Sequence, residues 1–284
     1  MRRIEGSSLG VYRTPLGLGV LFLTLAGIAS AQGAGTSQSA GQPATGQAAA
    51  AKAASGPPSA ATSAAAAPAS EAIPNPRDFD GVWWTPGYDR KYRTLDGQLP
   101  PFTERGRREW EAIVKADERG EPVADAPTGC LPHGIPRLLA SPYPIQIITT
   151  PGQMTWVHEV NRNQRWIYMD EKHPPNLPKT YLGHSVAHWE GDTLVIDTVG
   201  LNDKTRIDEE GITHSDQLHV VERIRKIEGG KALENLITIT DPVMFTQPWT
   251  TKRIYRARPE VRIMEYVCEE NNRNAPENGV TKAK

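Results

Sequence analysis

The sequence predicts a mainly β fold, in which an antiparallel meander of about 8–10 strands closes into a β-barrel with one N-terminal helix. Beyond Pro144, apolar and polar residues alternate with a period of two, as they do in half-buried strands. Turn-like pairs such as Pro151-Gly152 separate these runs, and short connections make successive strands antiparallel. Closure is expected because an open sheet of this size would expose two unpaired edges.

One short strand and one helix are predicted ahead of the meander. The opening strand is 79–84. Thr103 is suited to cap the helix, and Trp110 and Ile113 recur at helical spacing before Gly120 ends it. The strands predicted after the helix are 144–149, 153–160, 164–170, 182–189, 193–199, 217–227, 232–240, 249–257 and 261–268.

Two of these strands are predicted to form a hairpin that carries a histidine and a carboxylate. Glu190-Gly191 is the expected turn, in which the glycine supplies a positive φ. A turn at these two residues places His184 opposite Asp197 on one face, where the carboxylate orients the imidazole and raises its basicity. A three-residue loop would instead move Asp197 to the other face.

The chain divides into three predicted segments. Residues 1–31 combine basic residues, an apolar run and a final Ala29-Ser30-Ala31, which is typical of a cleaved signal peptide. An uncleaved anchor is the alternative, although the apolar run is shorter than the roughly 20 residues that span a bilayer. Residues 32–73 are rich in Ala, Gly, Ser and Pro and predict a disordered linker, and 74–284 predict a single domain. A periplasmic or secreted location is therefore expected.

The net charge of the chain and the motifs it lacks limit the classes of partner that we expect. Removing the leader changes the formal net charge from −1 to −3. This balance, without a block of Lys or Arg, argues against nucleic acid and against a membrane surface once the leader is cleaved. No cofactor is expected, because zinc-type cysteine pairs, H-E-x-x-H and C-x-x-C-H are all missing from the sequence. A metal site assembled from the distant His158, His184 and His214 is the alternative. The expected partner is a small molecule, and the sequence does not specify an oligomeric state.

The two cysteines, Cys130 and Cys268, are predicted to form a disulfide, since an exported domain folds in an oxidising compartment. The bond would join the irregular region before the meander to the last predicted strand. A reactive thiol is the alternative, but no base motif accompanies either residue. We therefore expect a structural bond.

The predicted strands also carry polar residues at positions that can face the interior. A fully packed core does not accommodate such groups, so they indicate a cavity that holds one small ligand. The residues concerned are His158, His184, Glu222, Arg253 and Glu265.

His184 is the first candidate for a general acid or base, with Asp197 as its orienting partner. The alternative is a strand histidine whose hydrogen bonds are all structural. His214 precedes the strand 217–227 and is the next catalytic candidate, because loops at a barrel mouth commonly carry function. Its alternative role is a local turn formed with Ser215.

The candidate substrate-binding residues are basic or aromatic. Arg137, Arg253 and Tyr143 are suited to hold an anionic group. Trp84 and Trp156 are suited to pack against an aromatic ring. Surface arginines and core tryptophans are the alternative reading of all five residues.

Several short motifs give the chain a family resemblance. They include Cys130-Leu-Pro-His-Gly-Ile-Pro-Arg137, Gly183-His-Ser185, Trp189-Glu-Gly-Asp-Thr-Leu-Val195, His214-Ser215, Asp241-Pro242 and Pro248-Trp-Thr250. From about 79 to 272 the chain resembles a large family of exported bacterial proteins, most of them uncharacterised. The meander is also similar to lipocalin-like (calycin) barrels, which include ligand carriers and cofactor-free phenolic acid decarboxylases. No residue motif of those subfamilies occurs here, so the second resemblance implies fold alone.

Together these observations predict an exported barrel that binds a small apolar or aromatic molecule. As an enzyme it would be a cofactor-independent lyase or decarboxylase that uses histidine acid/base chemistry. The alternatives are a non-catalytic periplasmic ligand-binding or structural protein, and a hydrolase, for which G-x-S-x-G and a carboxylate pair are missing. The sequence does not decide whether the protein is an enzyme.

Overall fold

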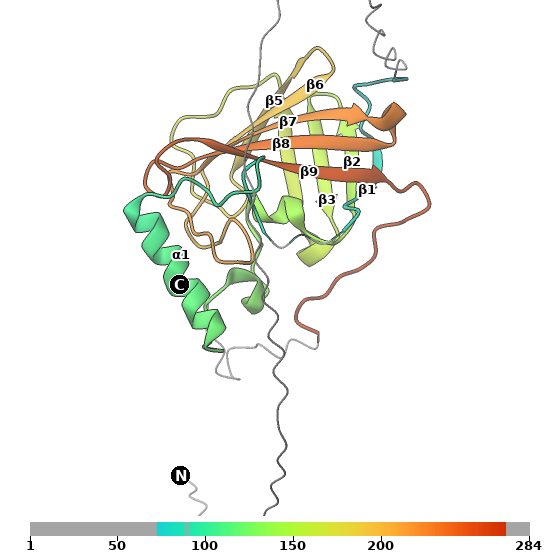
Figure 1. Ribbon diagram of the computed structural model, residues 1–284. Helices are drawn as coiled ribbons and strands as arrows, with labels where there is room; N and C mark the ends of the chain where they lie inside the picture. Colours follow the sequence, from blue (N-terminus) through green and yellow to red (C-terminus); the bar gives the residue numbers. More distant parts are fainter. Residues whose placement is uncertain (1–72, 88, 90, 271–284) are drawn as a thin grey trace, which may run out of the picture. The chain divides into compact units, whose positions relative to one another are not determined.

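Nine strands form one closed barrel in the computed structural model, which describes residues 73–270 except 88 and 90 (Figure 1). The predicted leader and nearly all of the predicted linker lie outside the described residues. Each strand pairs with the next along the chain, and the last pairs with the first, so the mainly β, mostly antiparallel barrel is confirmed. The strands are β1 (Gly81–Trp84), β2 (Ile145–Thr150), β3 (Gln153–His158), β4 (Gln164–Met169), β5 (His184–Glu190), β6 (Thr193–Val199), β7 (His219–Ile227), β8 (Ala232–Thr240) and β9 (Trp249–Ala257).

One pair of neighbours departs from the predicted meander. β4 and β5 run parallel, with Ile167 opposite Ser185. The connection 170–183 is long enough to return the chain to the start of β4 before β5 begins, which a short turn cannot do. The prediction of antiparallel neighbours throughout was therefore wrong at this pair.

The predicted final strand 261–268 does not form. β1 pairs with β9 through Trp83–Ala257 and Trp84–Arg256, so β9 has no free edge for a further strand. The segment after β9 is held along the barrel by side chains instead. The Met264 amide donates to Glu159 Oε2 at 2.8 Å, and Tyr266 packs edge-on against Tyr143.

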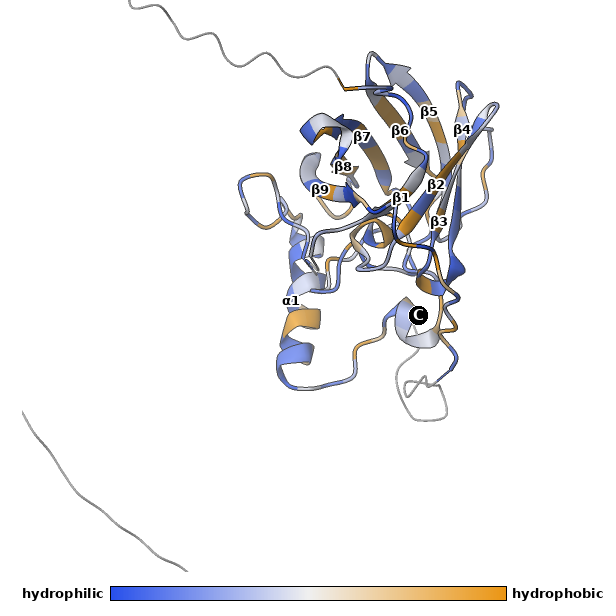
Figure 2. Cartoon of the chain, turned by 90° about the vertical axis from the view of Figure 1, so that its right-hand side faces the viewer, coloured by the Kyte–Doolittle hydropathy of each residue, from blue (hydrophilic) through white to orange (hydrophobic). Residues whose placement is uncertain are grey.

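Side chains that alternate along each strand fill the barrel. Hydrophobic and hydrophilic residues alternate along the strands in Figure 2. The inward residues make one hydrophobic core, whose largest fully buried side chains include Trp156, Tyr255, Ile167 and Leu194. Burial of this apolar surface supplies the main driving force for folding.

The predicted helix is confirmed as α1 (Glu104–Glu118). Thr103 Oγ1 accepts the Gly106 amide at 3.1 Å and caps the helix. α1 lies beside the connections at one end of the barrel rather than on a wall of strands (Figure 1). A side chain at Gly106 would clash with the Met244 carbonyl oxygen, so glycine permits this close contact. The short 3₁₀ helices are η1 (Ala126–Gly129), η2 (Arg137–Ala140), η3 (Val160–Arg162) and η4 (Glu228–Gly230).

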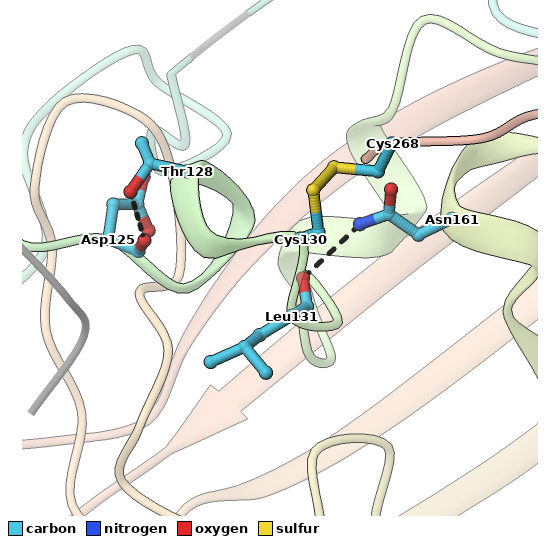
Figure 3. Close-up of a disulfide and its surroundings, with 6 residues drawn as sticks. All are labelled: Asp125, Thr128, Cys130, Leu131, Asn161 and Cys268. Atoms are coloured by element: carbon cyan, nitrogen blue, oxygen red, sulfur yellow. Dashed lines mark hydrogen bonds between the residues drawn. A yellow bond between two sulfur atoms is a disulfide. The ribbon is translucent and has the colours of Figure 1, made fainter. Parts of the chain in front are cut away.

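The predicted disulfide is also confirmed. Cys130 and Cys268 are bonded, with their Cα atoms 5.5 Å apart (Figure 3). Beside the bond, Asn161 Nδ2 donates to the Leu131 carbonyl at 3.2 Å. The bond indicates folding in an oxidising compartment. Within the described part of the chain, the helices are too short or too polar to cross a bilayer.

Candidate functional site

The β5–β6 hairpin has a different register from the predicted one. Gly191 and Asp192 form the turn, His184 pairs with Val199, and Asp197 pairs with Val186. Gly191 adopts a positive φ of 58°, as expected of the turn glycine. The shift is by two residues, so His184 and Asp197 still share one face. That face is the outer wall of the barrel, because Ser185 and Thr198 point inward.

A third residue, His173, connects His184 with Asp197. His173, in the connection 170–183, contacts His184 Nδ1 through its own Nδ1 at 3.0 Å. Its Nε2 contacts Asp197 Oδ1 at 3.1 Å. His219, at the start of β7, reaches the same Asp197 oxygen through Nε2 at 2.9 Å. We name His173, His184, Asp197 and His219 the histidine cluster.

The hydrogen bonds of the histidine cluster assign its tautomers. Asp197 accepts from His173 Nε2–H, so a neutral His173 carries a lone pair on Nδ1. That lone pair accepts His184 Nδ1–H, and the free lone pair of His184 therefore lies on Nε2. The chain from Asp197 through His173 to His184 thus ends in one basic nitrogen, His184 Nε2.

Electrostatics distinguish the members of the cluster. Burial, followed by the charge of His173, lowers the pKa of His184. The hydrogen bond to Asp197 raises the pKa of His219. Burial raises the pKa of Asp197, but the hydrogen bonds and charges of His219 and His173 outweigh it, so the net pKa lies below the ordinary value. At neutral pH the arrangement favours a neutral His184 beside an ionised Asp197.

His184 also lines a surface pocket of about 330 Å³. The pocket lies where β4 meets the end of the connection 170–183, and its walls include Trp166, Tyr168, Tyr181 and Leu182. The His184 ring stacks on Tyr168, with ring centroids 5.0 Å apart and an interplanar angle of 18°. A base therefore stands at the edge of a pocket with aromatic walls, which is the usual character of a small-molecule site.

His214 does not join the histidine cluster through any of its ring contacts. Its Nε2 bonds Thr205 Oγ1 at 2.9 Å and its Nδ1 bonds the Ser215 carbonyl at 3.0 Å. Burial lowers its pKa. Both ring nitrogens thus serve structural bonds, as in the alternative reading.

The inward positions predicted from the sequence divide into two sets. His158 and Glu222 are buried inside the barrel, and Arg253 is largely buried at its mouth. His184 faces outward, and Glu265 is exposed on the segment after β9, so both predictions of an inward position were wrong. The first error arose because alternation along the hairpin does not show which of its two faces points into the barrel. The second follows because 261–268 is not a strand.

A polar network crosses the barrel interior. Arg165 Nη2 donates to Glu222 Oε1 at 2.6 Å and to Thr198 Oγ1 at 2.8 Å, and Arg165 Nε donates to Ser185 Oγ at 3.1 Å. Asn235 Nδ2 donates to Glu222 Oε2 at 2.9 Å. These hydrogen bonds satisfy most polar atoms of the buried Arg165 and Glu222 side chains. The network therefore fixes how the interior side chains pack.

Two histidines near this network are held neutral. Burial, then the charges of Arg165 and His133, lowers the pKa of His158 to about 3. Burial, then the charge of Arg137, lowers the pKa of His133 to about 4. Neither is therefore charged at neutral pH.

The predicted substrate-binding residues lie apart from the histidine cluster. Trp156 is buried in the core, with the Arg165 guanidinium over its ring at 5.7 Å. Trp84 donates its indole N–H to the Pro142 carbonyl at 2.7 Å. Tyr143 packs on Tyr266, as described above. None of these three lines the His184 pocket.

The two predicted arginines lie at the mouth of the barrel. Arg137 is buried and donates to both oxygens of Asp125 at 2.6 and 2.7 Å. The Arg253 guanidinium stacks over the Tyr92 ring, 4.2 Å from its centroid. Neither arginine lines the His184 pocket.

Sequence reasoning missed His173, His219 and Tyr168. His219 lies two positions before Val221, which pairs with Asp197, so the register of β6 and β7 would have indicated it. His173 lies in a connection without periodicity and carries no such signal. Among the described residues, no group of three or more His, Cys, Asp or Glu side chains is arranged to hold a metal ion.

Comparison with known proteins does not extend this picture: no protein-family model matches the chain, and a search of curated proteins finds no match.

Proposed function

We propose that the protein binds a small aromatic molecule with an acidic proton in the His184 pocket, and that His184 acts as a general base on that proton. The observation that carries the proposal is the continuous chain from Asp197 through His173 to a His184 ring that lines an aromatic pocket. A base that is neutral and oriented before the ligand arrives accepts a proton without reorganisation.

The proton movement uses the tautomers assigned above. His184 Nε2 takes the proton of a phenol or similar acid, and the resulting imidazolium keeps its Nδ1–H bond to His173. Asp197 then lies one imidazole away from the new positive charge and stabilises it. In a decarboxylation of a phenolic acid, the ionised ring would push electrons to the carbon that bears the carboxylate, and that carbon would take the proton back from His184. The resulting quinone methide would accept the electron pair of the C–C bond as carbon dioxide leaves, which restores the phenolate.

The proposal also includes the barrel fold and the cellular location of the protein. A calycin-like barrel commonly handles small molecules, and the disulfide supports a periplasmic or secreted location. We place the site on the outer wall, since His184 faces outward and polar and apolar side chains fill the interior of the barrel.

Two probes test the proposal. Binding is measured by titrating 4-nitrophenol, whose absorbance reports its deprotonation, and turnover by the ultraviolet change as 4-hydroxycinnamate loses carbon dioxide. His184→Ala should lower turnover by about 100-fold or more, the usual contribution of a general base. Asp197→Asn should lower turnover with little effect on binding, because Asp197 does not line the pocket.

The pH profile supplies a second readout. Only neutral His184 accepts a proton, so activity should fall as pH drops through its pKa, which lies below that of an ordinary histidine. His188→Ala is the matched control, because His188 lies on the same face of β5 and, among the described residues, its ring bonds Glu190 rather than a member of the histidine cluster. Equal activity of His184→Ala and wild type would refute the catalytic role. Equal binding of 4-nitrophenol by Trp166→Ala and wild type would refute the pocket.

A further inference from the structure

The mouth of the barrel holds a second pocket, of about 350 Å³, formed where the chain after β1 meets β9. Its lining includes Thr85, Asp89, Lys252, Arg253 and Ile254. The histidine cluster contributes none of these residues, so this pocket is separate from the site of the proposed function.

Several contacts hold the guanidinium of Arg253, but its buried Nε lacks an acceptor in the part of the chain that the structure describes. It stacks on the buried Tyr92 ring, and its Nη2 donates to the Lys91 carbonyl at 2.8 Å. Its Nη1 faces Asp89 Oδ2 at 3.3 Å. The Arg253 side chain is 10% exposed, and its Nε is buried without a hydrogen-bond partner among the described residues. A buried guanidinium N–H without an acceptor is costly, so it points to an acceptor that the ligand supplies.

A second residue of the lining, Thr85, also has a buried polar atom without a partner in the described part of the chain. Thr85 Oγ1 has no hydrogen-bond partner among the described residues. Two side chains of the lining, Arg253 and Thr85, therefore each have a polar atom that no described residue satisfies.

Charge and shape define the ligand class. Two cations, Lys252 and Arg253, line the pocket against one carboxylate, Asp89, so the balance favours an anion. Ile254 and the neighbouring Pro86 give the remaining wall an apolar character. We propose that this pocket binds a small monocarboxylate with an apolar body, whose carboxylate lies against Lys252, the Arg253 guanidinium and Thr85.

The test uses benzoate as the probe and benzyl alcohol as its uncharged analogue, with the full exported chain in its oxidised form. Binding is measured by calorimetry and by the shift of the Arg253 Nε–H signal in nitrogen-15 spectra. Benzoate should bind more tightly than benzyl alcohol and shift that signal. Arg253→Gln should weaken benzoate by about tenfold or more, and Thr85→Val by about fivefold.

Controls separate this site from the rest of the molecule. Arg256→Gln removes an exposed arginine of the same strand, which pairs with Glu228, and should leave benzoate binding unchanged. His184→Ala should also leave it unchanged, so failure of the proposed function would not affect the result. Thr85→Val decides the test if Arg253→Gln fails to fold. Equal affinity for benzoate and benzyl alcohol, or unchanged benzoate binding in Thr85→Val, would overturn the proposal.

Discussion

The ion pair inside the barrel gives the sharpest stability prediction. Glu222 and Arg223 are consecutive on β7, and each takes part in an ion pair of nearly the same length. Glu222 meets Arg165 at 2.6 Å with side chains 0% and 1% exposed. Arg223 meets Glu190 at 2.7 Å with side chains 45% and 47% exposed. Burial is therefore the main difference between the two pairs.

Removing one partner of the buried pair should be far more costly than removing one of the exposed pair. Glu222→Leu leaves the Arg165 charge buried without its carboxylate, which costs about 3–5 kcal/mol. Glu190→Gln breaks a pair that water screens, which costs about 0–1 kcal/mol. Arg165→Met should cost about as much as Glu222→Leu, because it leaves a buried carboxylate.

The double variant Arg165→Met/Glu222→Leu removes both charges together. Asn235 Nδ2 is then the main donor left without its partner, and Ser185 and Thr198 keep their mutual bond at 2.9 Å. The double variant should therefore cost about 1–3 kcal/mol, well below the sum of the single variants.

Urea unfolding, extrapolated linearly to water, measures all four variants. The reasoning is refuted if Glu222→Leu costs no more than Glu190→Gln. It is also refuted if the two single costs simply add in the double variant, since the buried charges would then not depend on each other.

Two further predictions concern the disulfide and the helix. The bond between Cys130 and Cys268 closes a loop of 138 residues, so replacing both by serine should lower the free energy of unfolding by up to about 5 kcal/mol in the chain-entropy model. Unchanged urea midpoints in oxidised and reduced protein would contradict this. Gly106→Ala should lower the melting temperature, although helix propensity alone would add about 1 kcal/mol of stability, because the new methyl group meets the Met244 carbonyl. Asp117→Ala, on the exposed helix surface, is the control, and a higher melting temperature for Gly106→Ala would refute the packing argument.

Local signals were sufficient for most of the fold. Period-two alternation located the strands of the meander, and Thr103 identified the start of the helix because capping depends on residues next to each other. Strand direction across the connection 170–183 could not be predicted, because it depends on the path of the chain and not on composition. The segment 261–268 has strand-like alternation but lacks a partner edge, which is a property of the closed barrel.

The candidate site was predicted in part for a similar reason. A register error of two residues keeps every side chain on its face, so the prediction that His184 and Asp197 share a face is confirmed. The predicted pairing of His184 opposite Asp197 was wrong, because His184 pairs with Val199 and Asp197 with Val186. His173 completes the cluster from a segment whose position is set by tertiary contacts alone. Whether the shared face points into the barrel or away from it also depends on closure, because apolar residues such as Val186 and Val195 occur on the outer face as well.

The seam between β1 and β9 has the shortest ladder of the barrel, with two residue pairs. Cys130 lies between η1 and β2, which pairs with β1, and Cys268 follows β9, so the covalent bond links chain segments from the two sides of this seam. Amide hydrogen exchange should therefore be slow at β1 in the oxidised protein and quicken on reduction. A reduced molecule that opened there would present two bare strand edges to its neighbours, and the oxidising environment would thus protect the protein against self-association.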